Sequence, residues 1–466
     1  MINGAQSTIS QPIPFHQNPF PGLYGRQFKA GVVLVGLWLA TIGLHLLAWG
    51  HWLVYGCTVF AGLHLARLLF APMEILPVGL PGRDAAFASG GETPDLTLWP
   101  AVSILVAAKN ERTVIGRLVE SLVSLDYPVE RFEVWMIDDH STDGTAELLD
   151  RLAAQQANIR VVHRSDQATG GKSGALNEVW PQARGSVVVV FDADAQVPPD
   201  LLLRVVPLFQ RKSVGAVQVR KAIANAATNF WTRGQMAEMA FDAYCQRQRV
   251  AVAGIGELRG NGQFVRREAL ETCGGWNEAT ITDDLDLTFR LHLTGWDIPV
   301  VLFPAVEEEG VTQFKSLWHQ RNRWAEGGYQ RYLDYWRLLT PRRLGLNKTV
   351  DLFFFWLIQY ALPTMALPDL MMAVARTRPP VLTPLSSLVA TFLMVGMVKG
   401  LRISRKEPWL ISGVNAVRGM IYMFHWLVVM PTVTLRMALR PKRLRWVKTD
   451  HLGLEEPPFV GASVSE

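Results

Sequence analysis

The chain has 466 residues, of which 49% are hydrophobic, and a formal net charge of +5. This length is more than one ordinary domain needs, and its three cysteines (Cys57, Cys245 and Cys273) provide neither a disulfide framework nor a metal-ligand spacing. Unpaired thiols suit a reducing compartment. The Lys and Arg residues gather beside apolar stretches, which fits an anionic membrane surface better than nucleic acid.

The N-terminal part predicts a transmembrane hairpin. Residues 1–29 are polar, rich in Pro and Gln, and unlike a signal peptide. Two long apolar runs follow almost back to back over 30–71, each long enough to span a bilayer. Basic residues from Arg26 to Arg83 flank both ends, so the positive-inside rule puts both ends in the cytoplasm. A pair of buried helices in a soluble protein is the alternative.

The middle of the chain, residues 98–338, predicts an α/β fold. Apolar strands alternate there with helical patterns. Strands are expected at residues 101–107, 132–137, 159–163 and 187–191, and helices at 111–125 and 145–157. Apolar strands separated by helices indicate a mostly parallel sheet covered on both faces, which binds ligands beyond the carboxyl ends of its strands.

The C-terminal third, residues 350–436, is apolar again. Residues 353–375 and 381–398 are expected to span the bilayer, and 411–434 is a third candidate that carries Asn415, Arg418 and His425. Three spans would place the basic tail 437–466 outside, whereas the positive-inside rule places it in the cytoplasm. All or part of 408–436 is therefore expected to lie in the interface or to re-enter.

Paired carboxylates suggest a metal site. Asp192 and Asp194 follow an apolar strand, where residues two apart face the same way. Oxygen ligands of this kind suit Mg2+ or Mn2+ together with substrate phosphates, although an Asp-rich turn is the plainer interpretation. Asp138 and Asp139 close an earlier strand, and the residues after them also suit the start of the next helix.

Three further groups carry candidate chemistry. Asp283 and Asp284 open a helix, where they favour its positive end, but a carboxylate there also suits proton transfer. The residues Gln320, Arg323 and Trp324 share one helical face, with Arg suited to phosphate and Trp to a sugar ring; bilayer anchoring is the alternative. Lys172 follows two glycines that do not form a Walker A loop, so it is a lone cation for a phosphate.

Taken in order, these motifs resemble the inverting family 2 glycosyltransferases with the A-type nucleotide-sugar fold. The motifs are Asp138-Asp139, Asp192-Ala-Asp194, Thr282-Asp283-Asp284 and Gln320-Arg-Asn-Arg323-Trp324. The stretch Ala107-Ala-Lys109-Asn-Glu111 is similar to the P-x-x-N-E opening of the family, with Ala107 where Pro is usual. The resemblance identifies 98–338 as a cytoplasmic glycosyltransferase domain between membrane segments.

The resemblance also implies roles for individual residues. The UDP-sugar donor is expected to contact Ala107, Lys109, Glu111, Asp138, Asp139, Lys172, Asp192, Gln320 and Arg323. Asp192 and Asp194 are expected to hold Mg2+ or Mn2+, and Asp284 to be the general base. Trp324 is expected to contact the acceptor, as is Asn261, which lies between two glycines that equally fit a plain turn.

The acceptor is suggested by the run from Trp318 to Tyr335, which resembles the cyanobacterial monoglucosyldiacylglycerol synthases. That family transfers glucose from UDP-glucose to diacylglycerol, a lipid that reaches a site laterally from the bilayer. Two alternatives remain. A processive polysaccharide synthase shares the Q-x-x-R-W motif but usually has more helices, and Glu309 stands where its F-x-V-T motif has Phe. A membrane transporter, or a scaffold with an inactive transferase domain, is the other.

Overall fold

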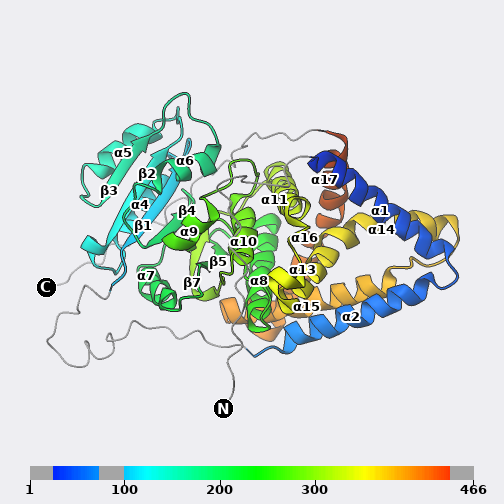
Figure 1. Ribbon diagram of the computed structural model, residues 1–466. Coiled ribbons are helices and arrows are strands. Elements are labelled where there is room, and N and C mark those ends of the chain that lie inside the picture. The colour runs from blue at the N-terminus through cyan, green and yellow to red at the C-terminus, as the bar shows by residue number, and fades with distance from the viewer. Residues whose placement is uncertain (1–24, 73–98, 441–466) are drawn as a thin grey trace, which may run out of the picture.

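The computed structural model describes residues 25–72 and 99–440. It has two parts, an α/β domain and a group of long apolar helices beside it (Figure 1). Most of the predicted polar N-terminal segment, the linker before the α/β domain and the basic tail beyond Arg440 lie outside the described residues.

The α/β domain is built on a seven-stranded sheet with the strand order β3-β2-β1-β4-β6-β5-β7. Strand β6 runs antiparallel to its neighbours β4 and β5, and the other strand pairs are parallel. The strands are β1 (Val102–Ala108), β2 (Phe132–Asp138), β3 (Ile159–His163), β4 (Val187–Phe191), β5 (Ala216–Ile223), β6 (Gln263–Arg266) and β7 (Val300–Glu308). The predicted α/β fold with a mostly parallel sheet is therefore confirmed.

Helices cover both faces of this sheet, as an apolar parallel strand requires. In β4, Val189 belongs to one buried apolar cluster, and its neighbours Val188 and Val190 belong to the cluster on the opposite face. The helices of the domain are α4 (Ile115–Val123), α5 (Thr145–Ala153), α6 (Gly171–Val179), α7 (Leu201–Val205), α8 (Phe230–Ala251), α9 (Arg267–Cys273), α10 (Asp283–Leu293), α11 (Phe314–Tyr335) and α12 (Pro341–Leu344).

Two of these helices are shorter than the sequence predicted. Helix α4 begins at Ile115 rather than at Glu111. The backbone N–H of Glu111 donates a hydrogen bond to Thr145 Oγ1 (2.9 Å), so this residue belongs to a loop tied to the start of α5. Helix α5 ends at Ala153 rather than at the predicted residue 157, and a turn follows it.

Within the described part of the chain, five helical stretches are long and apolar enough to cross a membrane. They are α1 (Arg26–Leu46), α2 (Gly50–Phe70), the stretch Leu346–Ala375, α15 (Thr383–Arg405) and the stretch Trp409–Leu439. Large apolar side chains on the hairpin α1–α2 face outward, including Leu39 (63% exposed) and Phe60 (67% exposed). Such exposure argues against helices buried in a soluble core and indicates membrane association.

Both ends of the α1–α2 hairpin dock on the α/β domain. Arg26, at the start of α1, forms a buried ion pair with Asp334 of α11. Arg67, near the end of α2, donates a hydrogen bond from Nη2 to the carbonyl oxygen of Val252 (2.8 Å). The two ends of the hairpin therefore lie on the same side, as predicted for a pair of spans that enters and returns.

The third and the fifth of these apolar stretches are not regular α-helices throughout. Leu346–Ala375 consists of α13 (Leu346–Trp356), a π-helical turn η4 (Leu357–Ala361) and α14 (Leu362–Ala375). Trp409–Leu439 is divided at Phe424 and His425 into α16 (Trp409–Met423) and α17 (Trp426–Leu439). The interfacial or re-entrant position predicted for 408–436 stays a prediction.

Candidate active site

The carboxyl ends of the central strands meet at one edge of the sheet. In the parallel registers, Ala108 of β1 lies opposite Asp138 of β2, and Val106 lies opposite Phe191 of β4. Asp192 follows β4 directly, and β7 ends at Glu308. Polar side chains from distant parts of the sequence are thereby gathered, and a cavity of about 470 Å³ opens among them.

Most of the predicted site residues line this cavity. They are Ala107, Glu111, Lys172, Asp192, Asp194, Asp284, Gln320, Arg323 and Trp324. The cavity continues between the α/β domain and the apolar helices, where Phe355, Gln359, Tyr360 and Trp426 form its wall. One space therefore joins the carboxyl edge of the sheet to the candidate membrane helices.

The residues at the end of β2 are not among those that line the cavity. Asp139 accepts a hydrogen bond from Arg164 Nη1 (2.6 Å), and Lys109 Nζ lies 4.0 Å from the same carboxylate. Asp138 is buried, with His163 Nδ1 at 3.7 Å from Oδ2, while its Oδ1 has no hydrogen-bond partner within residues 25–72 and 99–440. Asp139 is thus held by internal pairs, whereas Asp138 keeps an oxygen available.

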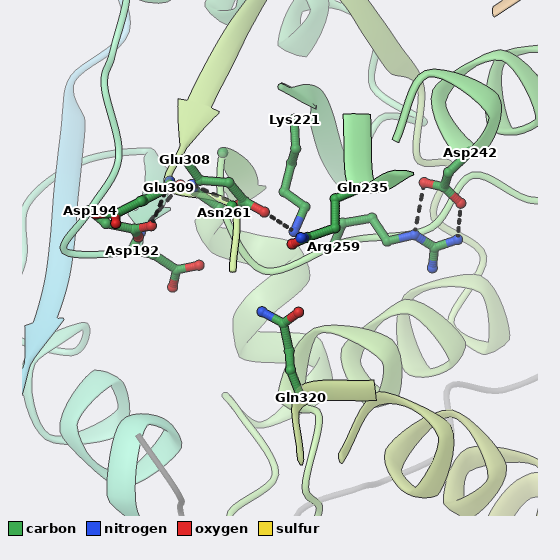
Figure 2. Close-up of polar contacts among 12 residues, drawn as sticks. Asp192, Asp194, Lys221, Gln235, Asp242, Arg259, Asn261, Glu308, Glu309 and Gln320 are labelled. Atoms are coloured by element: carbon green, nitrogen blue, oxygen red, sulfur yellow. Dashed lines mark hydrogen bonds and ion pairs between the residues drawn. The ribbon is translucent and has the colours of Figure 1, made fainter. Parts of the chain in front are cut away.

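Asn261 does not line the cavity either, and lies in a turn between Gly260 (φ 82°) and Gly262 (φ 70°). Positive φ values favour glycine at both positions, so the plain-turn interpretation accounts for them. The fully buried Asn261 accepts a hydrogen bond at Oδ1 from the backbone N–H of Asp192 (3.2 Å) and donates one from Nδ2 to Glu308 Oε2 (3.3 Å). These contacts, drawn in part in Figure 2, position the carboxylates of Asp192 and Glu308.

Three carboxylates meet at the end of the sheet, since Glu308 joins the predicted pair Asp192 and Asp194 (Figure 2). The Oδ2 of Asp194 accepts a hydrogen bond from the backbone N–H of Glu309 (3.0 Å). Burial, followed by the negative charges of Glu308 and Asp192, raises the pKa of Asp194 to about 8. A concentration of negative charge of this kind favours a cation.

Cationic side chains surround the same carboxylates. Lys172 forms an ion pair with Asp192, and Lys221 Nζ lies 3.1 Å from Glu308 Oε1. Burial raises the pKa of Asp192, but the charges of Lys172, Lys221 and Arg323 outweigh it, so that the pKa is lowered overall. This end of the cavity therefore suits an anionic ligand together with a cation.

The carboxylates of Asp283 and Asp284 enter the cavity from the N-terminus of α10. Thr282 occupies the predicted N-cap position, but its hydroxyl has no hydrogen-bond partner among the described residues. Burial, and then the like charge of Asp283, raise the pKa of Asp284 to about 6. A carboxylate with a pKa near neutrality can both hold and accept a proton under physiological conditions.

Helix α11 brings Gln320, Arg323 and Trp324 to the cavity, as their shared helical face predicted. The ring of Trp324 lies 4.1 Å from Arg321 Cζ and 5.3 Å from Lys221 Nζ. Two cations beside one indole fix its orientation. Trp324 is therefore a partly buried wall of the cavity rather than a freely exposed anchor.

A buried network holds Arg321 in place. Arg321 Nη2 donates hydrogen bonds to Glu238 of α8 and to the hydroxyl of Tyr422 (2.7 Å). The other oxygen of Glu238, Oε1, accepts a hydrogen bond from Trp426 Nε1 (2.8 Å). Helix α11 is thus connected to α16 and α17 on either side of the break between those two helices.

Sequence reasoning missed several residues of the cavity. They are Lys221, Glu238, Asp242, Arg259, Glu308, Gln359, Tyr360 and Trp426. Of these, Glu308 had a usable signal, since it closes a strand as Asp192 does. The others belong to no motif. Lys221 reaches the cavity from β5 and Arg259 from the loop before β6, whereas the remaining ones reach it because α8 and the apolar helices pack against the domain.

Comparison with known proteins gives a consistent result. The family model described as "Glycosyltransferase like family 2" matches residues 100–327. A "Beta-monoglucosyldiacylglycerol synthase" of Nostoc sp. is 55% identical over 439 residues, which cover 93% of this chain and 90% of that protein. A protein of the same description from Synechocystis sp. is 55% identical over 446 residues, or 94% of this chain and 91% of that protein.

A solved structure supports the fold. The "Mannosyltransferase PcManGT from Pyrobaculum calidifontis in complex with GDP-Man and Mn2+" has a TM-score of 0.53 and 22% sequence identity, and the match covers 86% of this chain and 99% of that one. The chain belongs to glycosyltransferase family 2. Its relatives over nearly the whole length are the cyanobacterial β-monoglucosyldiacylglycerol synthases, which confirms the resemblance seen at Trp318–Tyr335.

Proposed function

We propose that this protein transfers glucose from UDP-glucose to 1,2-diacylglycerol and thereby forms β-monoglucosyldiacylglycerol. The observation that carries the proposal is the single cavity with two unlike ends. Carboxylates and cations form the end at the sheet, whereas Phe355 and Trp426 from candidate membrane helices form the other. A nucleotide sugar suits the first end and a lipid the second. The 55% identity to synthases of this description supports the same function.

The donor is proposed to bind at the sheet edge. Asp138 Oδ1 is a buried acceptor without a partner in the described part of the chain, which suits an N–H of the uracil ring. Lys172 and Arg323 line the cavity beside Asp192, which supports the proposal that they contact the diphosphate. The internal pairs of Asp139 and the position of Lys109 suit a supporting role for both residues.

The residues present fit a divalent cation such as Mg2+ or Mn2+. Asp194 is held near Asp192 and Glu308, and burial and these like charges raise its pKa, so a cation there would relieve the repulsion. Among residues 25–72 and 99–440, no group of three His, Cys, Asp or Glu side chains would hold a metal unaided. Asp192 and Asp194 would therefore share it with diphosphate oxygens, and when bound it would stabilise negative charge on the departing UDP.

The proposed reaction is one in-line displacement. The acceptor hydroxyl oxygen attacks the anomeric carbon, the bond from that carbon to the phosphate oxygen breaks, and UDP departs with the electron pair. The hydroxyl proton passes to the Asp284 carboxylate, whose pKa of about 6 leaves it mostly ionised at neutral pH. Lys172 and Arg323 stabilise the charge that develops on the diphosphate. A single displacement inverts an α-linked donor to a β-linked product.

We also propose that the active site faces the cytoplasm. The two ends of the α1–α2 hairpin, with Arg26 and Arg67, dock on the catalytic domain, and the positive-inside rule assigns such ends to the cytoplasm. The cysteines at positions 57, 245 and 273 are unpaired, in agreement with a reducing compartment.

The test is an incubation of the purified full-length protein with radiolabelled UDP-glucose, Mg2+ and diacylglycerol in mixed micelles. Thin-layer chromatography should show one labelled lipid that carries a single hexose and is cleaved by a β-glucosidase. UDP-galactose in a parallel reaction measures donor preference. Label that stays at the origin as polymer, independently of diacylglycerol, would instead indicate a polysaccharide synthase.

A further inference from the structure

The membrane-facing end of the cavity has a wall of hydrogen-bond donors that the proposed chemistry does not use. Arg331 of α11 is 1% exposed and lines the cavity. Its Nη2 lies 3.2 Å from Glu257 Oε1 and its Cζ lies 4.6 Å from the centre of the Phe289 ring, whereas its Nε and Nη1 make no hydrogen bond to the described residues. Buried guanidinium N–H groups without acceptors are costly, so they point to an acceptor supplied by a ligand.

The polar groups beside Arg331 come from a candidate membrane span. Gln359 and Tyr360 lie in the π-helical turn η4 and line the same cavity. π-Helical turns within helices are frequent at functional sites, and polar side chains within a span usually face a polar cavity or a ligand. Tyr360 packs where Gly328 of α11 has no side chain, because a Cβ at position 328 would overlap the Tyr360 hydroxyl.

The charges around this wall are balanced. Three arginines pair with three acids: Arg249 with Asp351 and Glu257, Arg259 with Asp242 and Glu257, and Arg331 with Glu257. The wall therefore offers N–H and O–H donors without excess positive charge, which suits a neutral hydrogen-bond acceptor better than a phosphate. Phe355 and Trp426 flank it with aromatic surface.

We propose that Arg331, Gln359 and Tyr360 form a subsite that recognises the ester carbonyl groups of the acceptor lipid. This inference rests on the proposed function, because it concerns the same acceptor. An ester carbonyl is a neutral group that accepts and never donates hydrogen bonds, and in diacylglycerol it lies only a few bonds from the reacting hydroxyl. The acyl chains would leave past Phe355 and Trp426 toward the bilayer. The subsite would thus place the hydroxyl while it selects esters over ethers.

The experiment compares 1,2-diacylglycerol with a 1,2-dialkylglycerol of the same chain length, which keeps the free hydroxyl but lacks both carbonyls. Both are assayed at equal mole fraction in the same micelles. The wild-type kcat/KM should be about 25-fold higher for the diester, on the basis of about 1 kcal/mol for each of two hydrogen bonds. Gln359→Leu and Tyr360→Phe should each lower the diester value about fivefold and leave the diether value unchanged.

The matched control is Ser386→Leu, a polar-to-apolar change at an exposed position of α15 that does not line the cavity. Its kcat/KM for the diester and for the diether should equal those of the wild type. Arg331→Lys keeps a charge opposite Glu257 but loses Nε–H, and should also reduce the preference for the diester. Equal use of both lipids by the wild type, or an equal loss on both in Gln359→Leu and Tyr360→Phe, would overturn the subsite and leave the proposed function standing. If neither lipid were glucosylated, both the subsite and the proposed function would be overturned.

Discussion

The two ends of the cavity differ in how the fold constructs them. At the sheet edge, charged residues follow the ends of strands, and backbone contacts such as that from Asp192 to Asn261 hold them. At the membrane end, the lining residues come from α8, α11, α13, η4 and α17, and side-chain networks centred on Glu238 and Glu257 connect several of these elements. The carboxylates Asp192, Asp194 and Glu308 are thus held at the ends of strands, while the proposed surface for the lipid depends on how the apolar helices pack.

This difference has a functional consequence. Changes at the sheet edge should affect the donor and the chemical step, whereas changes at the membrane end should affect the acceptor alone. The predictions that follow test this division, from the largest expected effect to the smallest.

Asp284→Asn should lower kcat about 10³-fold, because an amide cannot accept the hydroxyl proton. UDP affinity, measured by calorimetry, should stay near the wild-type value. Burial and Asp283 raise the pKa of Asp284, so the ionised form destabilises the folded state at neutral pH, and the thermal midpoint of the variant should not fall. Asp150→Asn, at an exposed carboxylate, is the control. Normal turnover of Asp284→Asn would show that Asp284 is not the general base and serves only the start of helix α10.

Asp194→Ala should lower kcat/KM for the donor about 10²-fold, because a ligand of the proposed cation is lost. The enhancement of UDP binding by Mg2+ should disappear in the same variant. Asp200→Ala removes a nearby carboxylate that pairs with Arg204 and lies outside the cavity lining, and it should behave as wild type. Unchanged UDP affinity of Asp194→Ala with and without Mg2+ would refute the metal assignment.

The same division separates what the sequence could predict from what it could not. The carboxylates and the Gln320, Arg323 and Trp324 face were predicted because short motifs follow strand ends or share a helical face. The strand β4 matched its predicted bounds because five apolar residues between polar ones leave little choice. The fold class followed from the same alternation of strands and helices.

Residues whose positions depend on contacts far apart in the sequence could not be predicted from the sequence. The direction of Asn261 is set by Asp192 and Glu308, which lie 69 and 47 positions away in the sequence. Gln359 and Trp426 look like ordinary span residues until α13, η4 and α17 pack against α11. A local pattern carries no information about such tertiary packing.

The pH dependence of kcat/KM for the acceptor gives a prediction with an effect of intermediate size. Because the pKa of Asp284 is raised to about 6, its basic form is present above that pH and lost below it. At saturating Mg2+, kcat/KM for the acceptor should therefore fall about tenfold per pH unit below pH 6. With an ordinary carboxyl pKa the decline would begin about two units lower. Full activity at pH 5 would contradict Asp284 as the base in this environment.

Trp324→Ala should raise the acceptor KM about tenfold, because a large aromatic surface beside the acceptor is removed. The donor KM should change little. Trp336→Ala is the matched control, since Trp336 lies at the end of the same helix, is 56% exposed and does not line the cavity. Equal changes in both KM values would indicate that Trp324 serves the packing of α11 rather than the acceptor.

Trp426→Phe should have the smallest effect, because it keeps an aromatic wall and removes only the hydrogen bond from Nε1 to Glu238. Since an aromatic ring still fills the place of Trp426 in the wall, about 1 kcal/mol of the loss should reach the acceptor, which corresponds to about a fivefold rise in acceptor KM with the donor KM unchanged. Trp409→Phe on the exposed face of α16 is the control, and should leave both constants unchanged. A rise in donor KM with Trp426→Phe would show that the break between α16 and α17 is coupled to the sheet edge, and the two ends of the cavity would then have to be treated as one unit.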